Sequence, residues 1–213
     1  MKTYPLLGIY GGTFDPIHNG HCHVLRSCLP LLSWKRFLVM PSNIPPLKPH
    51  ATASKQDRVA MLRLALEEFP DTVTLDDREL QREGPSYTSD TVTALRQDYP
   101  GEIPVIILGD DVFASLPEWQ HWEDIIEHCH LIIINRRHEA PYHSALREPI
   151  KMREVSHINE FTQHPGGKLY FLHVPTVDLS STELRDKLAT HQSIANLVPN
   201  AVNRYIIGHK LYK

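Results

Sequence analysis

The chain is built around the sequence Gly11-Gly12-Thr13-Phe14-Asp15-Pro16-Ile17-His18-Asn19-Gly20-His21. This segment follows a short apolar run, residues 6–10, and precedes a leucine-bearing segment, which is typical of the turn from a first strand into a first helix. Nucleotides bind at that junction in open α/β sheets. Glycine lets the backbone approach a phosphate closely, and the start of a helix presents unpaired N–H groups to it. The segment therefore predicts a phosphate-binding loop.

Two histidines sharpen that prediction. His18 and His21 are three positions apart, so a helix that begins near Asn19 would place both imidazoles on the side facing the crevice. Each ring can donate a hydrogen bond to a phosphate oxygen, and either can take up a proton as negative charge grows. A glycine turn that serves only packing is the alternative, and the histidine pair argues against it.

Apolar runs alternate with helical patterns along the rest of the chain. Later strands are expected at residues 36–40, 73–75, 105–108, 131–134 and 169–174. Leucines extend the first helix toward residue 32, and further helices are expected at 54–69, 89–99, 118–128, from 180 and from 199, with Ser54 and Thr88 as N-caps. Residues 138–166 are expected to be loop-rich with one helix. The alternation predicts a single α/β domain over residues 1–213, a Rossmann-like doubly wound parallel sheet with helices on both faces and a C-terminal helical segment.

Composition narrows the class of protein. Hydrophobic residues make up 41% of the chain and charged residues 22%, as in soluble globular proteins, and a net charge of −3 disfavours a nucleic-acid partner. The apolar runs are too short to span a bilayer, and the N-terminus lacks the apolar core of a secretory signal. Cys22, Cys28 and Cys129 lack metal-type spacing, which favours reduced thiols. A cytoplasmic location without a membrane partner is expected.

A second hydroxyl-rich motif lies far along the chain, at Leu179-Ser180-Ser181-Thr182-Glu183-Leu184-Arg185. Ser180 and Glu183 have the spacing of a capping box, which predicts a helix N-terminus with Arg185 one turn inside it. A well-capped helix with no further role is the alternative. Beside a phosphate-binding loop, the hydroxyls and the guanidinium would supply donors to the other side of a triphosphate. We therefore expect the fold to join the two motifs into one clamp.

The two motifs also indicate a type of reaction. Neither offers a serine or cysteine nucleophile with a partnered base, nor the Gly-Lys-Ser/Thr of a Walker loop. This favours direct transfer, in which a substrate phosphate attacks the α-phosphorus of a nucleoside triphosphate and pyrophosphate leaves. Positioning and charge stabilisation by His18, His21 and Arg185 would lower the barrier. Mg²⁺ is expected to arrive with the triphosphate, and no protein metal ligands are assigned.

The motifs resemble those of a known superfamily. The first is similar to the H/T-x-G-H signature of the nucleotidyltransferases, which include nicotinate-nucleotide, pantetheine-phosphate and cytidylyl transferases. The second is similar to their I-S-S-T-x-[IL]-R motif, with a conservative change at Leu179. Residues 82–91 resemble the R-x-G-P-S-Y-T-x-D-T segment of bacterial nicotinate-mononucleotide adenylyltransferases. Backbone N–H groups at Tyr87 and Thr88 would suit a carboxylate rather than an amide. An N-capped packing helix is the alternative.

Residues 109–119 resemble the G-x-D-x(7)-W block of the same family. The resemblance implies that Trp119 stacks on a pyridine ring and that Gly109 and Asp111 contact the adenylate ribose. The alternative is that Trp119 packs beside Trp122 on one helix face.

Residues 41–49 correspond to the family's Pro-Pro-His-Lys loop, which implies that Asn43 and Lys48 hold the mononucleotide phosphate. Two positions depart from the family pattern: Leu47 replaces the usual histidine, and Gln120 stands where some relatives carry an aromatic residue.

The resemblance implies adenylyl transfer from ATP to nicotinate mononucleotide, which gives deamido-NAD and pyrophosphate. The alternatives are a pantetheine-phosphate or nicotinamide-mononucleotide adenylyltransferase, or an ATP-binding sensor without catalysis. The acceptor contacts are assigned to Asn43, Lys48, Ser86, Tyr87, Thr88 and Trp119. The ATP contacts are assigned to Gly11, Gly12, Thr13, Phe14, His18, His21, Gly109, Asp111, Ser180, Ser181, Thr182 and Arg185.

Overall fold

A parallel β-sheet forms the centre of the protein in the computed structural model, which describes residues 3–44, 51–135, 142–175 and 177–213. Within those residues the sheet has six strands in the order β3-β2-β1-β4-β5-β6. Every neighbouring pair is parallel. The strands are β1 (Leu6–Gly12), β2 (Trp34–Pro41), β3 (Val73–Leu75), β4 (Ile103–Gly109), β5 (His130–Asn135) and β6 (Leu169–His173). The strand order reverses between β1 and β4, which is where ligands bind in such sheets.

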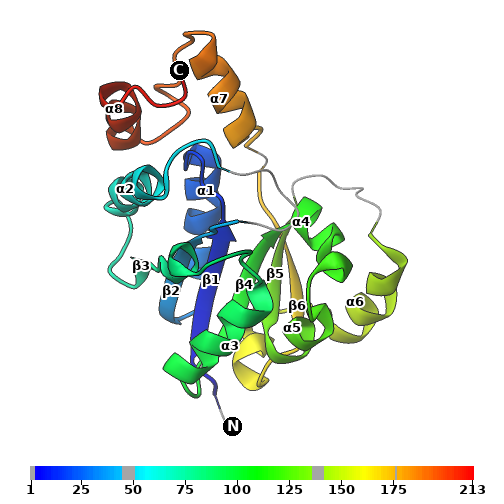
Figure 1. The fold of residues 1–213 in the computed structure, drawn as a ribbon. Coiled ribbons are helices and arrows are strands. Elements are labelled where there is room, and N and C mark those ends of the chain that lie inside the picture. The colour runs from blue at the N-terminus through cyan, green and yellow to red at the C-terminus, as the bar shows by residue number, and fades with distance from the viewer. Residues whose placement is uncertain (1–2, 45–50, 136–141, 176) are drawn as a thin grey trace.

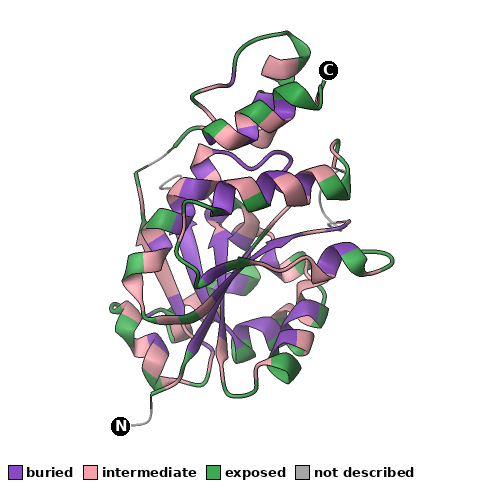
Figure 2. Cartoon of the chain, turned by 90° about the vertical axis from the view of Figure 1, so that its left-hand side faces the viewer, coloured by how far each residue is buried: buried purple, intermediate pink, exposed green. Residues whose placement is uncertain are grey.

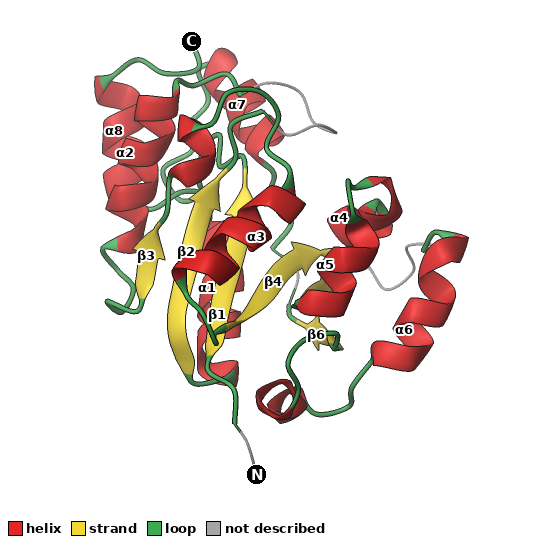
Figure 3. Cartoon of the chain, turned by 60° about the horizontal axis from the view of Figure 1, so that its bottom comes forward, coloured by secondary structure: helices red, strands yellow, loops and turns green. Residues whose placement is uncertain are grey.

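Helices cover both faces of the sheet, which confirms the predicted fold class (Figure 1). One buried cluster joins one face to α1 (Asn19–Cys28), α2 (Lys55–Leu66) and α8 (Asn200–Gly208), and α7 (Ser181–Ala189) adds Leu184. The other cluster joins the opposite face to α3 (Thr88–Asp98), α4 (Asp110–Ala114) and α5 (Trp122–His128), with α6 (Arg147–Arg153) packed at its margin. Figure 3 shows these helices flanking the strands.

The central strands are buried on both faces, as expected for a parallel sheet. Alternate residues of β4 enter opposite clusters: Ile107 belongs to the cluster with α1 and α2, and Ile106 to the cluster with α3 and α5. Figure 2 shows the buried residues concentrated on the strands and on the helix faces turned toward them. In the described residues no helix is long and apolar enough to cross a membrane.

Two helix starts are confirmed and one is wrong. Ser54 caps α2 by accepting a hydrogen bond from the Asp57 N–H, and Ser180 begins α7 with a capping box. Thr88 is not a cap, because α3 already begins there and the N-cap position belongs to Tyr87. The first helix also ends earlier than expected, at Cys28, because Pro30 sits in a short 3₁₀ turn, η1 (Leu29–Leu31).

The helix expected over residues 118–128 is confirmed from Trp122 to His128, but its predicted start is wrong. The chain instead forms α4, then a 3₁₀ turn η3 (Leu116–Glu118) that contains Pro117, and α5 begins only at Trp122. His121 has a φ of 53°, a left-handed conformation that separates η3 from α5. Trp119 and Trp122 therefore do not share a helix face.

The segment expected to be loop-rich contains one α-helix, α6, as predicted. It also holds two 3₁₀ turns, η4 (Ser144–Leu146) and η5 (Ile158–Gln163). Residues 138–141 of that segment lie outside the described residues.

His130, at the start of β5, predicts a pH-dependent stability. Its side chain is 0% exposed, its Nε2 lies 3.2 Å from the His164 carbonyl oxygen, and its Nδ1 accepts the Lys168 N–H. Burial lowers the pKa of His130 from 6.5 to about 4. Because the unfolded chain then binds the proton more tightly, the free energy of unfolding should fall as the pH drops from 6.5 toward 4. The loss attributable to His130 between pH 7.5 and pH 5.0 should be about 2 kcal/mol.

Urea unfolding at both pH values checks this prediction. His130→Asn keeps a side-chain acceptor but cannot titrate, so its unfolding free energy should depend less on pH by that amount. His143→Asn is the matched control, because the Nδ1 of exposed His143 also accepts a backbone N–H, from Ala145. Equal pH dependence in wild type and His130→Asn would contradict the assignment.

Candidate functional site

The first turn of α1 is held by two histidines that cap each other. His18 is the N-cap residue, and its Nδ1 accepts the His21 N–H at 3.4 Å. In return the Nδ1 of His21 accepts the His18 N–H at 3.3 Å. The two rings stack with centroids 3.7 Å apart. The two rings lie side by side, and each imidazole is oriented by the backbone of the other.

These bonds determine which ring nitrogen carries the proton. A neutral imidazole that accepts through Nδ1 must carry its hydrogen on Nε2. Both rings are therefore Nε2–H donors in this arrangement. Donation through Nε2–H leaves both capping bonds intact.

Gly20 leaves room for the His18 ring. A Cβ added at Gly20 would lie 3.0 Å from both Cε1 and Nδ1 of that ring, tighter than ordinary van der Waals contact. An alanine at this position would therefore push the His18 ring by a few tenths of an ångström.

Gly20→Ala should separate activity from stability. Alanine favours a helix over glycine by up to about 1 kcal/mol, so the melting temperature should not fall. The displaced His18 ring should nevertheless lower turnover at least tenfold, since small misplacements of a positioned group cost about 10²-fold. Steady-state kinetics and thermal melts measure the two effects. Gly208→Ala, in α8, is the control, because a Cβ there meets no atom of the described residues within 4 Å. Unchanged turnover in Gly20→Ala would contradict this role.

The N-terminus of α7 docks on the loop that precedes α1. The Ser181 hydroxyl donates to the Pro16 carbonyl oxygen at 3.0 Å, and Arg185 Nη1 donates to the Asp15 carbonyl oxygen at 2.8 Å. Arg185 Nη2 also donates to Thr182 Oγ1 at 3.2 Å. The fold therefore brings together the two motifs that the sequence analysis expected to form a clamp. Figure 1 shows α7 beyond the end of the sheet toward which the strands run.

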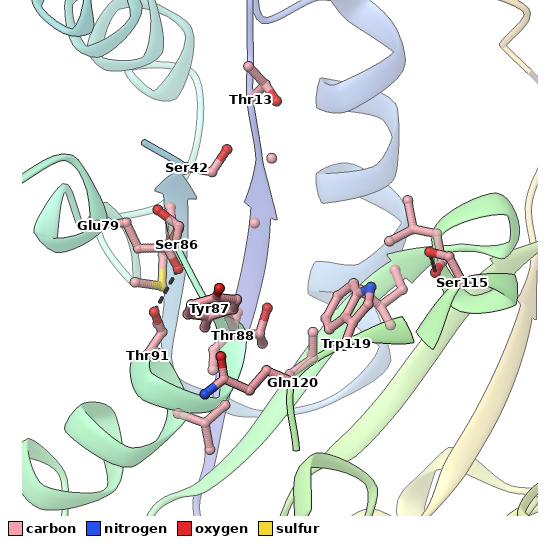
Figure 4. Close-up of a pocket in the computed structure, with 18 of the residues that line it drawn as sticks. Thr13, Ser42, Glu79, Ser86, Tyr87, Thr88, Thr91, Ser115, Trp119 and Gln120 are labelled. Carbon is pink, nitrogen blue, oxygen red and sulfur yellow. Dashed lines mark hydrogen bonds between the residues drawn. The ribbon is translucent and has the colours of Figure 1, made fainter. Parts of the chain in front are cut away.

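A cavity of ≈ 380 Å³ lies beside this junction, over the end of β1. Figure 4 shows Thr13 at the end of β1, with Tyr87 and Thr88 on one side of the cavity and Trp119 on the other. Of the residues assigned from sequence, those that line it are Gly11, Gly12, Thr13, Ser86, Tyr87, Thr88, Asp111 and Trp119. Gln120, which departs from the family pattern, also lines it. The residues that line the cavity do not include His18, His21 or the α7 motif, which lie at the α1–α7 junction.

A buried hydrogen-bond network supports the wall that carries Tyr87 and Thr88. The Thr91 hydroxyl donates to Glu79 Oε1 at 2.7 Å, and Arg82 Nη1 donates to the same hydroxyl at 2.7 Å. Ser86 also hydrogen-bonds Glu79 and accepts the Asn43 N–H at 3.0 Å. Burial raises the pKa of Glu79, and the hydroxyl partners oppose that rise. Glu79 could not be predicted as a site residue, because its neighbours in sequence give no sign that it is buried.

A buried arginine lies beneath the phosphate-binding loop. Arg58, in α2, is 1% exposed, and its Nη1 donates to the carbonyl oxygens of Thr13 and Ser42 at 2.8 and 2.9 Å. It was also missed, although it precedes Leu62 by one helical turn and so lies on the apolar face of that helix. That position is the signal that could have identified it.

Two assigned residues, Phe14 and Asn43, are not among those that line the cavity. Phe14 is buried and packs edge-on against the Tyr10 and His21 rings, so a contact with ATP would come from its backbone. The Asn43 amide donates to the Arg82 carbonyl oxygen. Lys48 lies outside the described residues.

Comparisons with known proteins agree with this geometry. The model of the cytidylyltransferase-like family matches residues 9–187. A probable nicotinate-nucleotide adenylyltransferase of Pseudomonas syringae pv. tomato is 38% identical over 100% of this chain and 96% of that protein. This chain belongs to the nicotinate-nucleotide adenylyltransferases. Another member, from Salmonella gallinarum, is 35% identical over the full length of both chains.

The adenylyltransferase fold is also found in solved structures. The Plasmodium falciparum nicotinic acid mononucleotide adenylyltransferase, determined in complex with NaAD, aligns with a TM-score of 0.77 over 98% of both chains at 22% identity. At that identity the likeness shows a shared fold. As members of this enzyme family are nucleotidyltransferases, the chain is one as well.

Proposed function

We propose that this enzyme transfers the adenylyl group of ATP to nicotinate mononucleotide, giving deamido-NAD and pyrophosphate. The observation that carries the proposal is the docking of α7 on the α1 loop, beside a cavity lined by Tyr87, Thr88 and Trp119. The α1–α7 junction offers hydrogen-bond donors for a triphosphate. The cavity offers the aromatic ring of Trp119 and the N–H groups at the start of α3. The family relationship supports the same substrates.

The triphosphate would be bound at the α1–α7 junction. His18 and His21 offer Nε2–H donors, and Arg185 offers a fixed positive charge held by the Asp15 carbonyl oxygen. The N–H groups at the starts of α1 and α7 add further donors. These groups would stabilise charge on the departing pyrophosphate.

We propose that Mg²⁺ binds together with ATP and that the protein supplies no dedicated set of metal ligands. In the described residues no group of three or more His, Cys, Asp or Glu could hold a metal ion. The oxygens of the triphosphate would supply the ligands, and the bound ion would neutralise part of their charge.

The acceptor would bind in the cavity. Its pyridine ring would stack on Trp119, and its carboxylate would accept hydrogen bonds from the N–H groups at the start of α3. Asn43 and Lys48 remain the proposed phosphate contacts. The Asn43 side-chain amide already donates to the Arg82 carbonyl oxygen, so this hydrogen bond would have to break before the amide could contact the phosphate.

We propose direct in-line attack of the acceptor phosphate, with no covalent enzyme intermediate. Burial raises the pKa of the Cys22, Cys28 and Cys129 thiols to about 11, 12 and 12, so all three stay protonated at neutral pH. Reduced, buried cysteines also support the proposed cytoplasmic location.

Pyrophosphate release with Mg-ATP and each of three acceptors tests the function. Nicotinate mononucleotide should be preferred to nicotinamide mononucleotide and to phosphopantetheine. Trp119→Leu should raise the KM for nicotinate mononucleotide about tenfold, as for a lost base–aromatic stack. Trp122→Leu is the control, because Trp122 lies outside the cavity lining. Preference for the amide would overturn the acceptor assignment, and the absence of pyrophosphate release with all three acceptors would favour a sensor.

A further inference from the structure

Four separate segments of the chain meet at the carboxylate of Asp15, in the loop between β1 and α1. This side chain is 2% exposed. Its Oδ1 accepts the Tyr212 hydroxyl at 2.7 Å and the Ala53 N–H at 3.1 Å. Its Oδ2 accepts the Thr52 N–H at 2.6 Å and lies 3.8 Å from Arg185 Nη1. Asp15 therefore links the phosphate-binding loop to the segment before α2, to α7 and to the end of the chain.

The contact from Tyr212 is specific and long-range. Tyr212 is the second-last residue, 197 positions from Asp15 in sequence. Its φ is 62°, and that of Lys210 is 55°, so the segment after α8 turns back through left-handed conformations that bulky residues rarely adopt. Burial and the nearby Asp15 carboxylate raise the pKa of Tyr212, which keeps its hydroxyl protonated as the donor.

Asp15 also occupies the point at which α7 is attached. Its own carbonyl oxygen accepts Arg185 Nη1, and the next carbonyl oxygen, that of Pro16, accepts the Ser181 hydroxyl. The orientation of this backbone therefore sets the position of Arg185 relative to His18 and His21, two and five residues beyond Pro16.

We propose that Tyr212 is a positioning residue for adenylyl transfer, whose hydroxyl fixes the Asp15 carboxylate so that its ion pair with the Arg185 guanidinium stays long. The proposal rests on the proposed function, because it assigns Arg185 to the triphosphate. Without the hydroxyl, Oδ1 keeps a single donor, the Ala53 N–H. The long ion pair that Oδ2 already makes with Arg185 Nη1, at 3.8 Å, can then shorten. That pair would withdraw the guanidinium from ATP.

The chain offers a closely matched control in Tyr205 of α8. Its hydroxyl donates to Asp57 Oδ1 at 2.9 Å, so it too links the C-terminal segment to an aspartate. Asp57 lies in the first turn of α2 and not in the phosphate-binding loop. Tyr205→Phe and Tyr212→Phe therefore remove the same type of bond, and only the second touches Asp15.

Steady-state kinetics of wild type, Tyr205→Phe and Tyr212→Phe, with Mg-ATP and nicotinate mononucleotide, test the proposal. In Tyr212→Phe we expect kcat/KM for ATP to fall about tenfold, as for one lost hydrogen bond to a charged group, with the KM for nicotinate mononucleotide within twofold. Tyr205→Phe should match wild type in both parameters. Thermal melts identify any loss due to unfolding.

A double-mutant cycle tests whether Tyr212 acts through the carboxylate. Asp15→Asn removes the charge that would pair with Arg185, so adding Tyr212→Phe to Asp15→Asn should cause less than a twofold further change. The proposal would be overturned if kcat/KM for ATP in Tyr212→Phe equalled that of wild type, or if Tyr205→Phe lost as much as Tyr212→Phe. It would also be overturned if the effects of Tyr212→Phe and Asp15→Asn were fully additive. An inactive wild-type enzyme would instead overturn the proposed function, and this role with it.

Discussion

His21→Asn should lower kcat for adenylyl transfer by about 10²–10³-fold while leaving the fold intact, as for loss of a donor to a developing negative charge. The Nδ1 of His21 serves α1 by accepting the His18 N–H, and the asparagine side-chain oxygen can take over that role. The variant therefore removes the Nε2–H donor and keeps the cap. Initial rates with saturating substrates, together with a thermal melt, measure the two functions of the ring separately.

Two companion variants make the His21 result specific. His21→Gln places an amide near the former Nε2 position and should recover part of the lost rate. His23→Asn, two residues further along α1 and not assigned to ATP, should keep kcat within twofold. If His21→Asn turns over within threefold of wild type, the imidazole is only a helix cap and the clamp is wrongly assigned.

Arg58→Met should lower the free energy of unfolding by about 3 kcal/mol, the cost of removing one partner from a buried charged network. The substitution leaves the Thr13 and Ser42 carbonyl oxygens without their guanidinium donor. It also removes the positive charge near the buried Asp15 carboxylate. Both carbonyls belong to loops at the ends of β1 and β2, so we expect activity to fall together with stability.

Urea unfolding at neutral pH measures the effect of Arg58→Met. Arg63→Met is the control, since Arg63 lies on the exposed side of the same helix and its loss should change the unfolding free energy by less than about 0.5 kcal/mol. A loss below 1 kcal/mol in Arg58→Met would show that the buried charge is not needed to hold the loops.

Local patterns in the sequence were sufficient for the fold class and for the two motifs. The apolar runs at residues 105–108 and 131–134 predict strands that the structure contains as β4 and β5, and Ser180 with Glu183 predicts a helix start that it also contains. The spacing of His18 and His21 predicts rings on one side of α1. In each case the residues on which the prediction rests lie within one helical turn or one strand, where periodicity and capping determine the local structure.

The errors and omissions come from interactions that the local sequence does not encode. Trp119 was expected on a helix because its neighbours suit one, but Pro117 and the left-handed His121 divide that segment. The partners of Asp15 are even less predictable, since Tyr212 lies 197 positions away and contributes through tertiary packing alone. The network around Glu79 that supports the cavity wall likewise depends on burial that only the assembled fold provides.

We propose above that the protein positions ATP and the acceptor for one direct displacement. ATP made chiral at the α-phosphorus by a single sulfur substitution tests this most directly, with nicotinate mononucleotide as acceptor. One in-line displacement inverts the configuration at phosphorus, whereas a covalent enzyme intermediate requires two displacements and retains it. The arrangement of His18, His21 and Arg185 predicts inversion in the deamido-NAD product. Retention of configuration would contradict the account.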